Sequence, residues 1–345
     1  MKNSSAIAII TTGGTIGAAL AGGVTTLANS AGARNFHGFV NDYGKRRKLK
    51  FEIFAAFNKF SEDLTPADWG TVLQQIAVCL KAGFRRIIIA HGTDTLAYTA
   101  SAVSLYHGDG PARICFVSAF IPSSERYSDA FGNMAAAAEV LHGNLLKPGV
   151  YVATRRNGAV DILRAQDLKP AEFDGTSFGS VYGQTAARVH DTRSVRTASL
   201  KTFPLLAKGP APTCRQLAKG ELQAVILPCY PGLSLDRLRL DRDREALIIL
   251  ASYHSGTVPA LDLRKQIKGL RREYPKARVI AAAHPHQHVK NPYETTAALE
   301  RDGLLRIYKD LQPHQIYVLA LCETARGLKL DTVMRQAKAW HFSAV

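Results

Sequence analysis

The chain has 345 residues, of which 46% are hydrophobic and 21% are charged. This composition is typical of a folded soluble protein and excludes disordered and collagen-like sequences. Its 44 Lys and Arg against 28 Asp and Glu give a formal net charge of +16, which favours an anionic partner without choosing among nucleic acid, membrane surface and small molecule.

Short apolar runs rich in Ile and Val recur along the chain and predict strands buried on both faces. In chain order they cover 7–10, 86–90, 114–118, 150–153, 225–227, 246–250 and 279–282. Segments with the period of amphipathic helices lie between them, at 69–82, 128–141, 263–274 and 295–302. The alternation predicts an α/β fold, with a doubly wound, mostly parallel sheet in a larger N-terminal domain and a smaller C-terminal α/β domain.

The stretch 200–220 interrupts this alternation with Phe203-Pro204 and Gly209-Pro210-Ala211-Pro212. Clustered Pro and Gly between periodic segments are typical of a linker. We therefore expect an N-terminal domain at 1–200, a linker at 201–220 and a C-terminal domain at 221–345.

The five cysteines are widely spaced and form no C-x-x-C pair, which suits a reducing compartment. The uncharged stretch from 3 to 33 resembles a signal peptide only superficially, because its apolar run ends after five residues at Ile10. No other run approaches the roughly 20 apolar residues that span a bilayer. We expect a cytoplasmic protein without a membrane partner.

The first predicted strand continues into Thr11-Thr12-Gly13-Gly14-Thr15-Ile16-Gly17. Paired glycines allow a tight turn, and the threonines place hydroxyls at the strand tip. Neither the Walker G-x-x-x-x-G-K-[ST] pattern nor G-x-G-x-x-G is present. An ordinary turn, a hydroxyl nucleophile and a dinucleotide loop all remain open from this segment alone.

The strand at 86–90 is followed by His91-Gly92-Thr93-Asp94-Thr95-Leu96. A lone Thr-Asp pair is usually a helix N-cap. Ligands of doubly wound sheets, however, bind beyond the carboxyl ends of the strands. Two threonine-bearing strand ends in one domain therefore indicate a shared site.

These two segments resemble the signatures of the bacterial-type L-asparaginases, the asparaginase/glutaminase amidohydrolases: T-G-G-T-I after the first strand and H-G-T-D-T after a later one. Both are intact here, at 12–16 and 91–95. The segment 61–69 resembles the family's substrate-binding serine segment, and 230–234 and 252–256 resemble C-terminal segments of its cytosolic branch. The resemblance covers most of the chain.

The resemblance implies that Thr15 is the nucleophile and that Thr93 is a second catalytic threonine, paired with Asp94 and a lysine. Lys169 is the candidate for that lysine, because it precedes 174–178, which resembles the family's D-x-x-[ST]-F. Such a cluster supplies a hydroxyl, a base and an orienting anion.

The resemblance also implies a set of substrate-binding residues. Ser61 and Glu62 would hold the substrate's α-carboxylate and α-amine, with Asp94 also on the amine, and Gly14 and Gly92 complete the set. Backbone amides at the glycine turn and near Thr93 would stabilise the oxyanion. No metal or organic cofactor is expected.

The expected activity is hydrolysis of the side-chain amide of L-asparagine, or of L-glutamine, to the acid and ammonia through a threonine acyl-enzyme. By resemblance, the protein would form a homodimer or homotetramer. One alternative is an amidohydrolase of the same fold that acts on a larger or anionic amide. Another is a catalytically silent binding protein that recognises an acidic ligand or RNA.

Two segments depart from the family pattern. The family places a lid tyrosine after the T-G-G-T-I turn, whereas 16–42 contains no tyrosine and Tyr43 is the first lid candidate. Ile121 stands where the family's G-[AS]-M-R-P segment has arginine.

Two further clusters are assigned to solvated loops. His284, His286 and His288 alternate as zinc ligands can, but Pro285 and the following Lys290-Asn291-Pro292 favour a polar loop. The basic run Lys45-Arg46-Arg47-Lys48-Leu49-Lys50 lacks interleaved aromatics, so a nucleic-acid partner is not expected.

Overall fold

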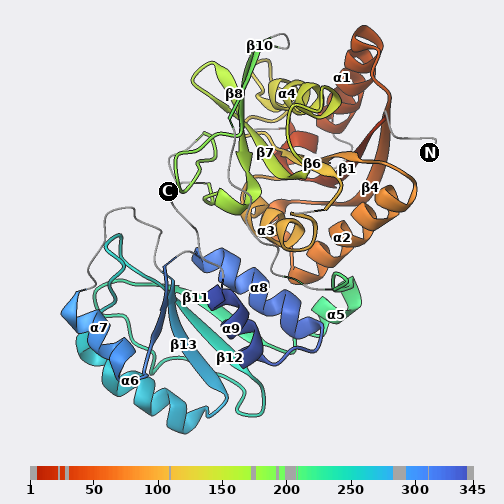
Figure 1. Cartoon of the computed structure of the whole chain (residues 1–345). Helices are drawn as coiled ribbons and strands as arrows, with labels where there is room; N and C mark the ends of the chain where they lie inside the picture. Colours follow the sequence, from red (N-terminus) through yellow and green to blue (C-terminus); the bar gives the residue numbers. More distant parts are fainter. Residues whose placement is uncertain are drawn as a thin grey trace. The chain divides into compact units, whose positions relative to one another are not determined.

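The computed structural model describes residues 6–21, 24–27, 31–108, 110–171, 176–191, 194–198, 207, 209–282, 293–309 and 311–339. The chain divides into two compact units, Met1–Cys214 and Arg215–Val345 (Figure 1). No helix in these described ranges is both long enough and apolar enough to cross a membrane.

An eight-stranded mixed sheet forms the centre of the N-terminal unit, in the order β10-β9-β8-β7-β6-β5-β1-β4. Its strands are β1 (Ile7–Gly13), β4 (Phe51–Lys59), β5 (Arg86–Ala90), β6 (Arg113–Val117), β7 (Gly149–Arg156), β8 (Ala159–Arg164), β9 (Ala187–Asp191) and β10 (Ser194–Thr197). The five neighbouring strands β7, β6, β5, β1 and β4 are parallel to one another, and β8, β9 and β10 extend the sheet as antiparallel strands. The α/β prediction is confirmed.

Helices cover both faces of this sheet (Figure 1). They are α1 (Ala31–Arg47), α2 (Pro66–Lys81), α3 (Leu96–His107) and α4 (Ala130–His142). Side chains of α1 and α4 share one buried cluster with Ile7 and Ile9, whereas those of α2 and α3 share another with Ala8 and Ile10. Alternate residues of β1 thus point into opposite cores, as the period of a strand requires.

The strand register aligns the carboxyl ends of β1, β5, β6 and β7. Thr11 pairs with Ala90, Ala90 with Val117, and Val117 with Ala153. The residues that follow these positions therefore lie along one edge of the sheet, which we call the carboxyl edge.

Several short elements follow strands of this sheet along the chain. The 3-10 turn η1 (Thr15–Gly17) and the hairpin β2 (Ala19–Ala21) with β3 (Val24–Thr26) follow β1. The turn η2 (Ser61–Asp63) follows β4. The turn η3 (Ala165–Asp167) follows β8 and lies at the edge opposite the carboxyl edge, because β8 is antiparallel to β7 and ends beside its first residues.

The C-terminal unit contains a parallel sheet in the order β11-β12-β13-β14. Its strands are β11 (Gln223–Pro228), β12 (Ala246–Ala251), β13 (Ala277–Ala282) and β14 (Arg306–Tyr308); its helices are α6 (Ala260–Glu273), α7 (Glu294–Arg301), α8 (Pro313–Ala325) and α9 (Leu330–Ala339). The short helix α5 (Cys214–Ala218) lies at the boundary of the two units.

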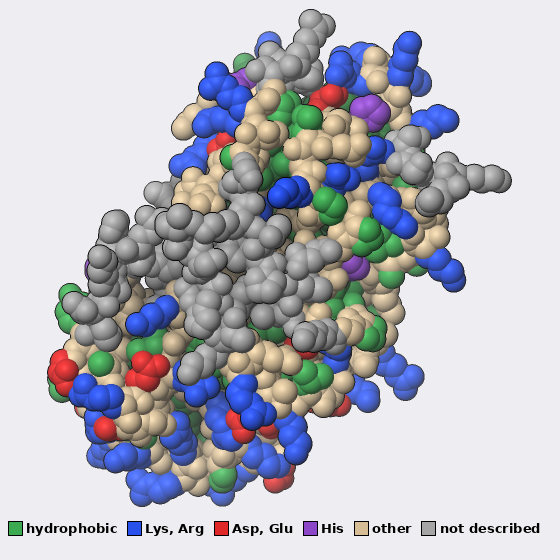
Figure 2. Space-filling model, viewed as in Figure 1, with side chains coloured by type: hydrophobic (Ala, Val, Ile, Leu, Met, Phe, Trp, Pro, Cys, Tyr) green, Lys and Arg blue, Asp and Glu red, His purple; other side chains and the backbone are tan. Residues whose placement is uncertain are grey.

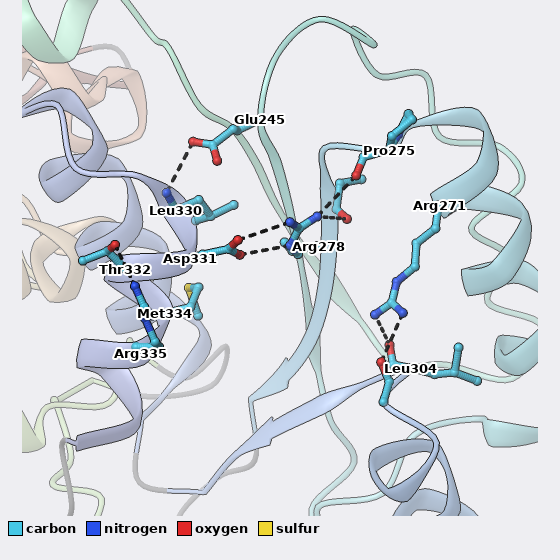
Figure 3. A network of polar contacts seen from close by, with 12 residues as sticks. Glu245, Arg271, Pro275, Arg278, Leu304, Leu330, Asp331, Thr332, Met334 and Arg335 are labelled. Carbon is cyan, nitrogen blue, oxygen red and sulfur yellow. Dashed lines mark hydrogen bonds and ion pairs between the residues drawn. The ribbon is translucent and has the colours of Figure 1, made fainter.

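Arginine side chains attach helices to this smaller sheet (Figure 3). On β13, Arg278 donates through Nε to the Asp331 carboxylate of α9 at 3.1 Å. On α6, Arg271 donates to the carbonyls of Gly303 and Leu304. On the face drawn in Figure 2, Lys and Arg side chains are scattered and mixed with acidic ones, so they form no single basic patch on the part of this face that the structure describes.

Candidate active site

The glycine turn after β1 adopts a backbone that other residues rarely take. Gly13 and Gly14 have φ of 95° and 76°, in the left-handed region that glycine occupies without penalty. The Gly14 N–H donates to the Lys59 carbonyl at 2.9 Å, and the Gly17 N–H donates to the Gly14 carbonyl at 2.9 Å, which forms the 3-10 turn η1. The turn thereby places Thr15 at the start of η1; the Thr15 side chain lies outside the described part of the structure.

The two signature segments meet through their glycines. A Cβ at Gly14 would lie 2.4 Å from Gly92 Cα and 2.5 Å from Gly92 N, so only glycine fits between the two main chains. A Cβ at Gly92 would lie 2.6 Å from both Cβ and Oγ of Ser61. The structure therefore brings Gly14, Gly92 and Ser61 into direct contact at the carboxyl edge.

Hydrogen bonds join Ser61 to Asp94. The buried Ser61 hydroxyl donates to Asp94 Oδ2 at 2.9 Å and accepts from the Asp94 N–H at 3.2 Å. Thr95 Oγ1 donates to the Ser61 carbonyl at 2.7 Å, while Asp94 and Glu62 are exposed. The anchored Asp94 carboxylate, which faces solvent, is suited to binding an ammonium group, and the Ser61 hydroxyl beside it is suited to binding a carboxylate.

Thr93 is buried between these groups. Neither its N–H nor its hydroxyl has a hydrogen-bond partner among the residues that the structure describes. Buried amide groups nearly always have a hydrogen-bond partner. Because the Thr93 N–H has none among the described residues, it is available to donate to a ligand at this edge.

His91, which adjoins Gly92, lies at the same edge and is not among the predicted site residues. Its Nδ1 lies 2.7 Å from the Gly92 carbonyl oxygen and its Nε2 lies 2.9 Å from Thr99 Oγ1. Complete burial lowers the pKa of His91 to about 4, because it disfavours the charged imidazolium. His91 is therefore neutral at pH 7.

An ion pair fixes the segment that leads from β4 to α2. Lys59 Nζ lies 2.7 Å from Asp68 Oδ1, and Thr65 donates to Asp68 Oδ2 through both N–H and hydroxyl. These bonds hold the pKa of Asp68 below its usual value against the opposing effect of burial. They position η2, and with it Ser61, although neither Lys59 nor Asp68 is among the predicted site residues.

Main-chain bonds place Lys169 with respect to the sheet. Its N–H donates to the Gly179 carbonyl at 2.9 Å, and the neighbouring Phe178 N–H donates to Thr154 Oγ1 at 3.0 Å. Thr154 follows Ala153 on β7, so this segment lies at the carboxyl edge. Asp174 of the predicted D-x-x-[ST]-F segment lies outside the described residues.

The expectation that Tyr43 belongs to a lid is wrong. Tyr43 is buried on α1, near the amino end of β4, where the Leu49 N–H bonds to the Gly44 carbonyl. Its hydroxyl donates to Glu139 Oε1 at 2.6 Å, and Arg47 pairs with the same carboxylate. The sequence between the turn and β4 forms a helix, which carries Tyr43 to the sheet edge opposite the glycine turn.

The loop after β6 is held by the Asp129 carboxylate. Asp129 Oδ1 accepts the N–H groups of Phe120 at 3.0 Å and Ile121 at 3.1 Å, and the Ser128 hydroxyl donates to the Ile121 carbonyl. The Ile121 side chain is 42% exposed. The departure from the family pattern thus presents an apolar side chain to solvent on an ordered loop.

Groups of three or more potential metal ligands are absent from the described part of the chain. The alternating residues His284, His286 and His288 lie outside it.

The family model "Asparaginase, N-terminal" matches residues 6–202. One subunit of the glutamyl-tRNA(Gln) amidotransferase of Pyrobaculum aerophilum is 29% identical over 189 residues, which cover 51% of this chain and 42% of the relative. The same subunit from Nanoarchaeum equitans is 29% identical over 210 residues, 59% of this chain and 46% of the relative. The chain thus spans less than half the length of these curated relatives.

Solved structures match the fold over nearly the whole chain. A probable cytoplasmic L-asparaginase from Campylobacter jejuni superimposes with a TM-score of 0.77 at 20% identity, covering 97% of this chain and 99% of the other. The thermostable L-asparaginase from Thermococcus kodakarensis gives a TM-score of 0.73 at 22% identity, with 96% of each chain covered.

Proposed function

Because this chain belongs to the asparaginase family and is an amidohydrolase of that family, we propose that it hydrolyses the side-chain amide of L-asparagine, or of L-glutamine, to the acid and ammonia. The observation that carries the proposal is the contact of Gly14 with Gly92 and of Gly92 with Ser61. It joins the segments bearing Thr15, Thr93 and Ser61 at one sheet edge.

The reaction proceeds through an ester on Thr15. The Thr15 hydroxyl oxygen attacks the amide carbon while its proton passes to a base, and the tetrahedral intermediate collapses as the C–N bond breaks and ammonia leaves with a proton. Water then attacks the ester carbon, releasing the acid and restoring the hydroxyl. We assign the proton transfers to Thr93, Asp94 and Lys169, since a threonine hydroxyl needs a neighbouring proton acceptor.

Ser61 and Asp94 supply the ends of the substrate site. On substrate binding, the Ser61 hydroxyl would turn its proton from Asp94 Oδ2 to the α-carboxylate, and the exposed carboxylates of Asp94 and Glu62 would bind the α-amine. The hydrogen bonds between Ser61 and Asp94 support this arrangement, because they hold the hydroxyl and the carboxylate side by side, as the two groups on one α-carbon require.

The free Thr93 N–H is the proposed oxyanion donor. It has no partner among the described residues and follows the glycine in contact with Gly14. A preorganised backbone donor stabilises the charge of the tetrahedral intermediate without reorganising during the reaction.

The test is ammonia release from L-asparagine and L-glutamine by the purified protein and by Thr15→Ala. We expect at least a roughly 1,000-fold loss of kcat, on the order found when a nucleophile is removed. Thr71→Ala on α2 is the matched control, because its hydroxyl only donates to the Ala67 carbonyl of the same helix. Full activity in Thr15→Ala would reject the nucleophile, and no release by the wild type would reject both substrates.

A larger or anionic amide is the second candidate substrate. The exposed Ile121 on the loop after β6 favours it, and relatives of this chain are subunits of a glutamyl-tRNA(Gln) amidotransferase. Asparagine whose α-carboxyl group is extended in a peptide would then have the higher kcat/KM. The silent binding role is not supported, given membership of an amidohydrolase family.

A cytoplasmic homodimer or homotetramer is part of the same proposal. The cytoplasmic location is supported by the likeness to a probable cytoplasmic L-asparaginase from Campylobacter jejuni, and the oligomer by the family resemblance alone. Light scattering on the eluting protein would measure the oligomer, and a monomer with full activity would contradict it.

A further inference from the structure

We propose that His91 is a positioning residue, which holds the Gly92 carbonyl and thereby directs the Thr93 N–H toward the reacting amide. This inference rests on the proposed function. His91 does not touch the substrate in this scheme; it acts through the peptide bond between Gly92 and Thr93.

The partners of the ring determine its tautomer. A carbonyl oxygen only accepts hydrogen bonds, so the 2.7 Å contact with Gly92 requires the proton on Nδ1. Nε2 of the neutral ring is then an acceptor, and the Thr99 hydroxyl donates a hydrogen bond to it at 2.9 Å. The edge of Phe116 packs against the ring with centroids 5.9 Å apart, which restricts the ring further.

The restraint is needed because the position must be glycine. The packing of Gly92 against Ser61 excludes a Cβ, but glycine lacks the steric preferences that fix other residues. Without a further partner, the peptide that follows Gly92 would have several orientations of similar energy. The His91 hydrogen bond selects one of them.

The planar peptide transmits this choice to Thr93. In a trans peptide the C=O and N–H bonds point in opposite directions, so a carbonyl turned toward His91 turns the Thr93 N–H away from it. That N–H has no partner in the described part of the chain. His91 thus sets the direction of the one donor on which the oxyanion proposal depends.

Two amide substitutions separate the two ring nitrogens. The side-chain NH₂ of His91→Asn reaches the position of Nδ1 and can still donate to Gly92, whereas that of His91→Gln reaches the position of Nε2 and cannot. We expect His91→Asn to keep kcat within about tenfold and His91→Gln to lose about 100-fold, on the scale of one oxyanion donor. KM should change less than about threefold in both, because Ser61 and Asp94 are untouched.

The ordering of these variants distinguishes positioning from stability. Equal losses of kcat that follow the losses in unfolding free energy would show a merely structural residue and overturn the proposal. Wild-type kcat in His91→Gln would overturn it as well.

The tautomer is measured without any activity. In protein labelled with ¹⁵N-histidine, the His91 signal, identified by its loss in His91→Asn, should report a protonated Nδ1 and a bare Nε2 at pH 7. The other tautomer, or an imidazolium, would overturn the proposal. Failure to release ammonia by a protein with the expected tautomer would instead reject the proposed substrates.

Discussion

Replacing Gly14 with alanine tests the contact between the two signature segments. The new Cβ would lie 2.4 Å from Gly92 Cα and 2.5 Å from Gly92 N, both main-chain atoms that no side-chain rotation can move. The same residue has φ of 76°, where a side chain is strained in any case. We expect a loss of both stability and activity.

The magnitude follows from these two costs. A non-glycine residue in the left-handed region costs about 1–2 kcal/mol. Overfilling a packed site costs about 1–3 kcal/mol. Together they give a fall of about 2–5 kcal/mol in the free energy of unfolding, a large share of the roughly 5–15 kcal/mol typical of proteins. Separation of Gly14 from Gly92 also displaces the Thr15 segment, for which a shift of about 1 Å reduces kcat about 100-fold.

Urea unfolding, followed by tryptophan fluorescence, measures the stability, because Trp69 is buried in the same unit. Gly132→Ala on α4 is the control: its Cβ would have no atom within 4 Å, and the helix should gain about 0.5–1 kcal/mol. Ammonia release gives kcat for both variants. Wild-type stability and kcat in Gly14→Ala would refute the argument that this contact aligns the site.

Three further predictions concern other parts of the N-terminal unit. Tyr43→Phe removes the hydrogen bond to Glu139, so it should lower the unfolding free energy by about 1–3 kcal/mol and leave kcat unchanged. A change in kcat would show that Tyr43 acts in the active site after all. Ser61→Ala should raise KM for asparagine about 10–100-fold with a smaller effect on kcat, and an unchanged KM would exclude Ser61 from binding. Burial lowers the pKa of both His91 and His107 to about 4, so the unfolded state binds more protons than the folded state between pH 4 and 6.5. The free energy of unfolding should therefore fall as the pH decreases through this window, and less steeply in His107→Asn. Urea unfolding at several pH values measures both slopes.

Most strands of the parallel core were predictable from the sequence, because buried parallel strands are continuous apolar runs. The parallel strands β4 and β14 were missed, since β4 is only partly buried and β14 has three residues. The run at 86–90 coincides with β5, and that at 246–250 lies within β12. The antiparallel strands β8, β9 and β10 were missed, since they carry polar residues between apolar ones. The expected linker at 201–220 stays a prediction, because 201–206 and 208 lie outside the described residues.

Helix α1 explains the error on Tyr43. Its three glycines, Gly32, Gly38 and Gly44, lower its helix propensity. Its apolar residues nevertheless recur with the period of a helix, at Phe36, Phe39, Val40 and Tyr43. Gly32 is required by tertiary packing, since its Cβ would lie 1.7 Å from the Ala18 carbonyl oxygen. The helix was missed because these glycines outweighed an apolar period that the local sequence does contain.

The meeting of the candidate site residues at one sheet edge was predictable for those that follow parallel strands. Gly14, Ser61, Gly92 and Asp94 lie together at the carboxyl edge. His91 was not singled out, although it begins the second motif, because its part depends on the direction of one carbonyl group. That direction is a property of the folded backbone alone.

The meeting of Gly14 with Gly92 has a consequence for changing the substrate of such a protein. The spacing between the two threonine segments is set by main-chain atoms in van der Waals contact, so it cannot be narrowed, and a side chain at either glycine would widen it only with a loss of stability. Variation in substrate range must then come from the rim, where Glu62 and Ile121 are exposed. One part of the site is thereby closed to adaptation, while the other is free to diverge without disturbing the chemistry.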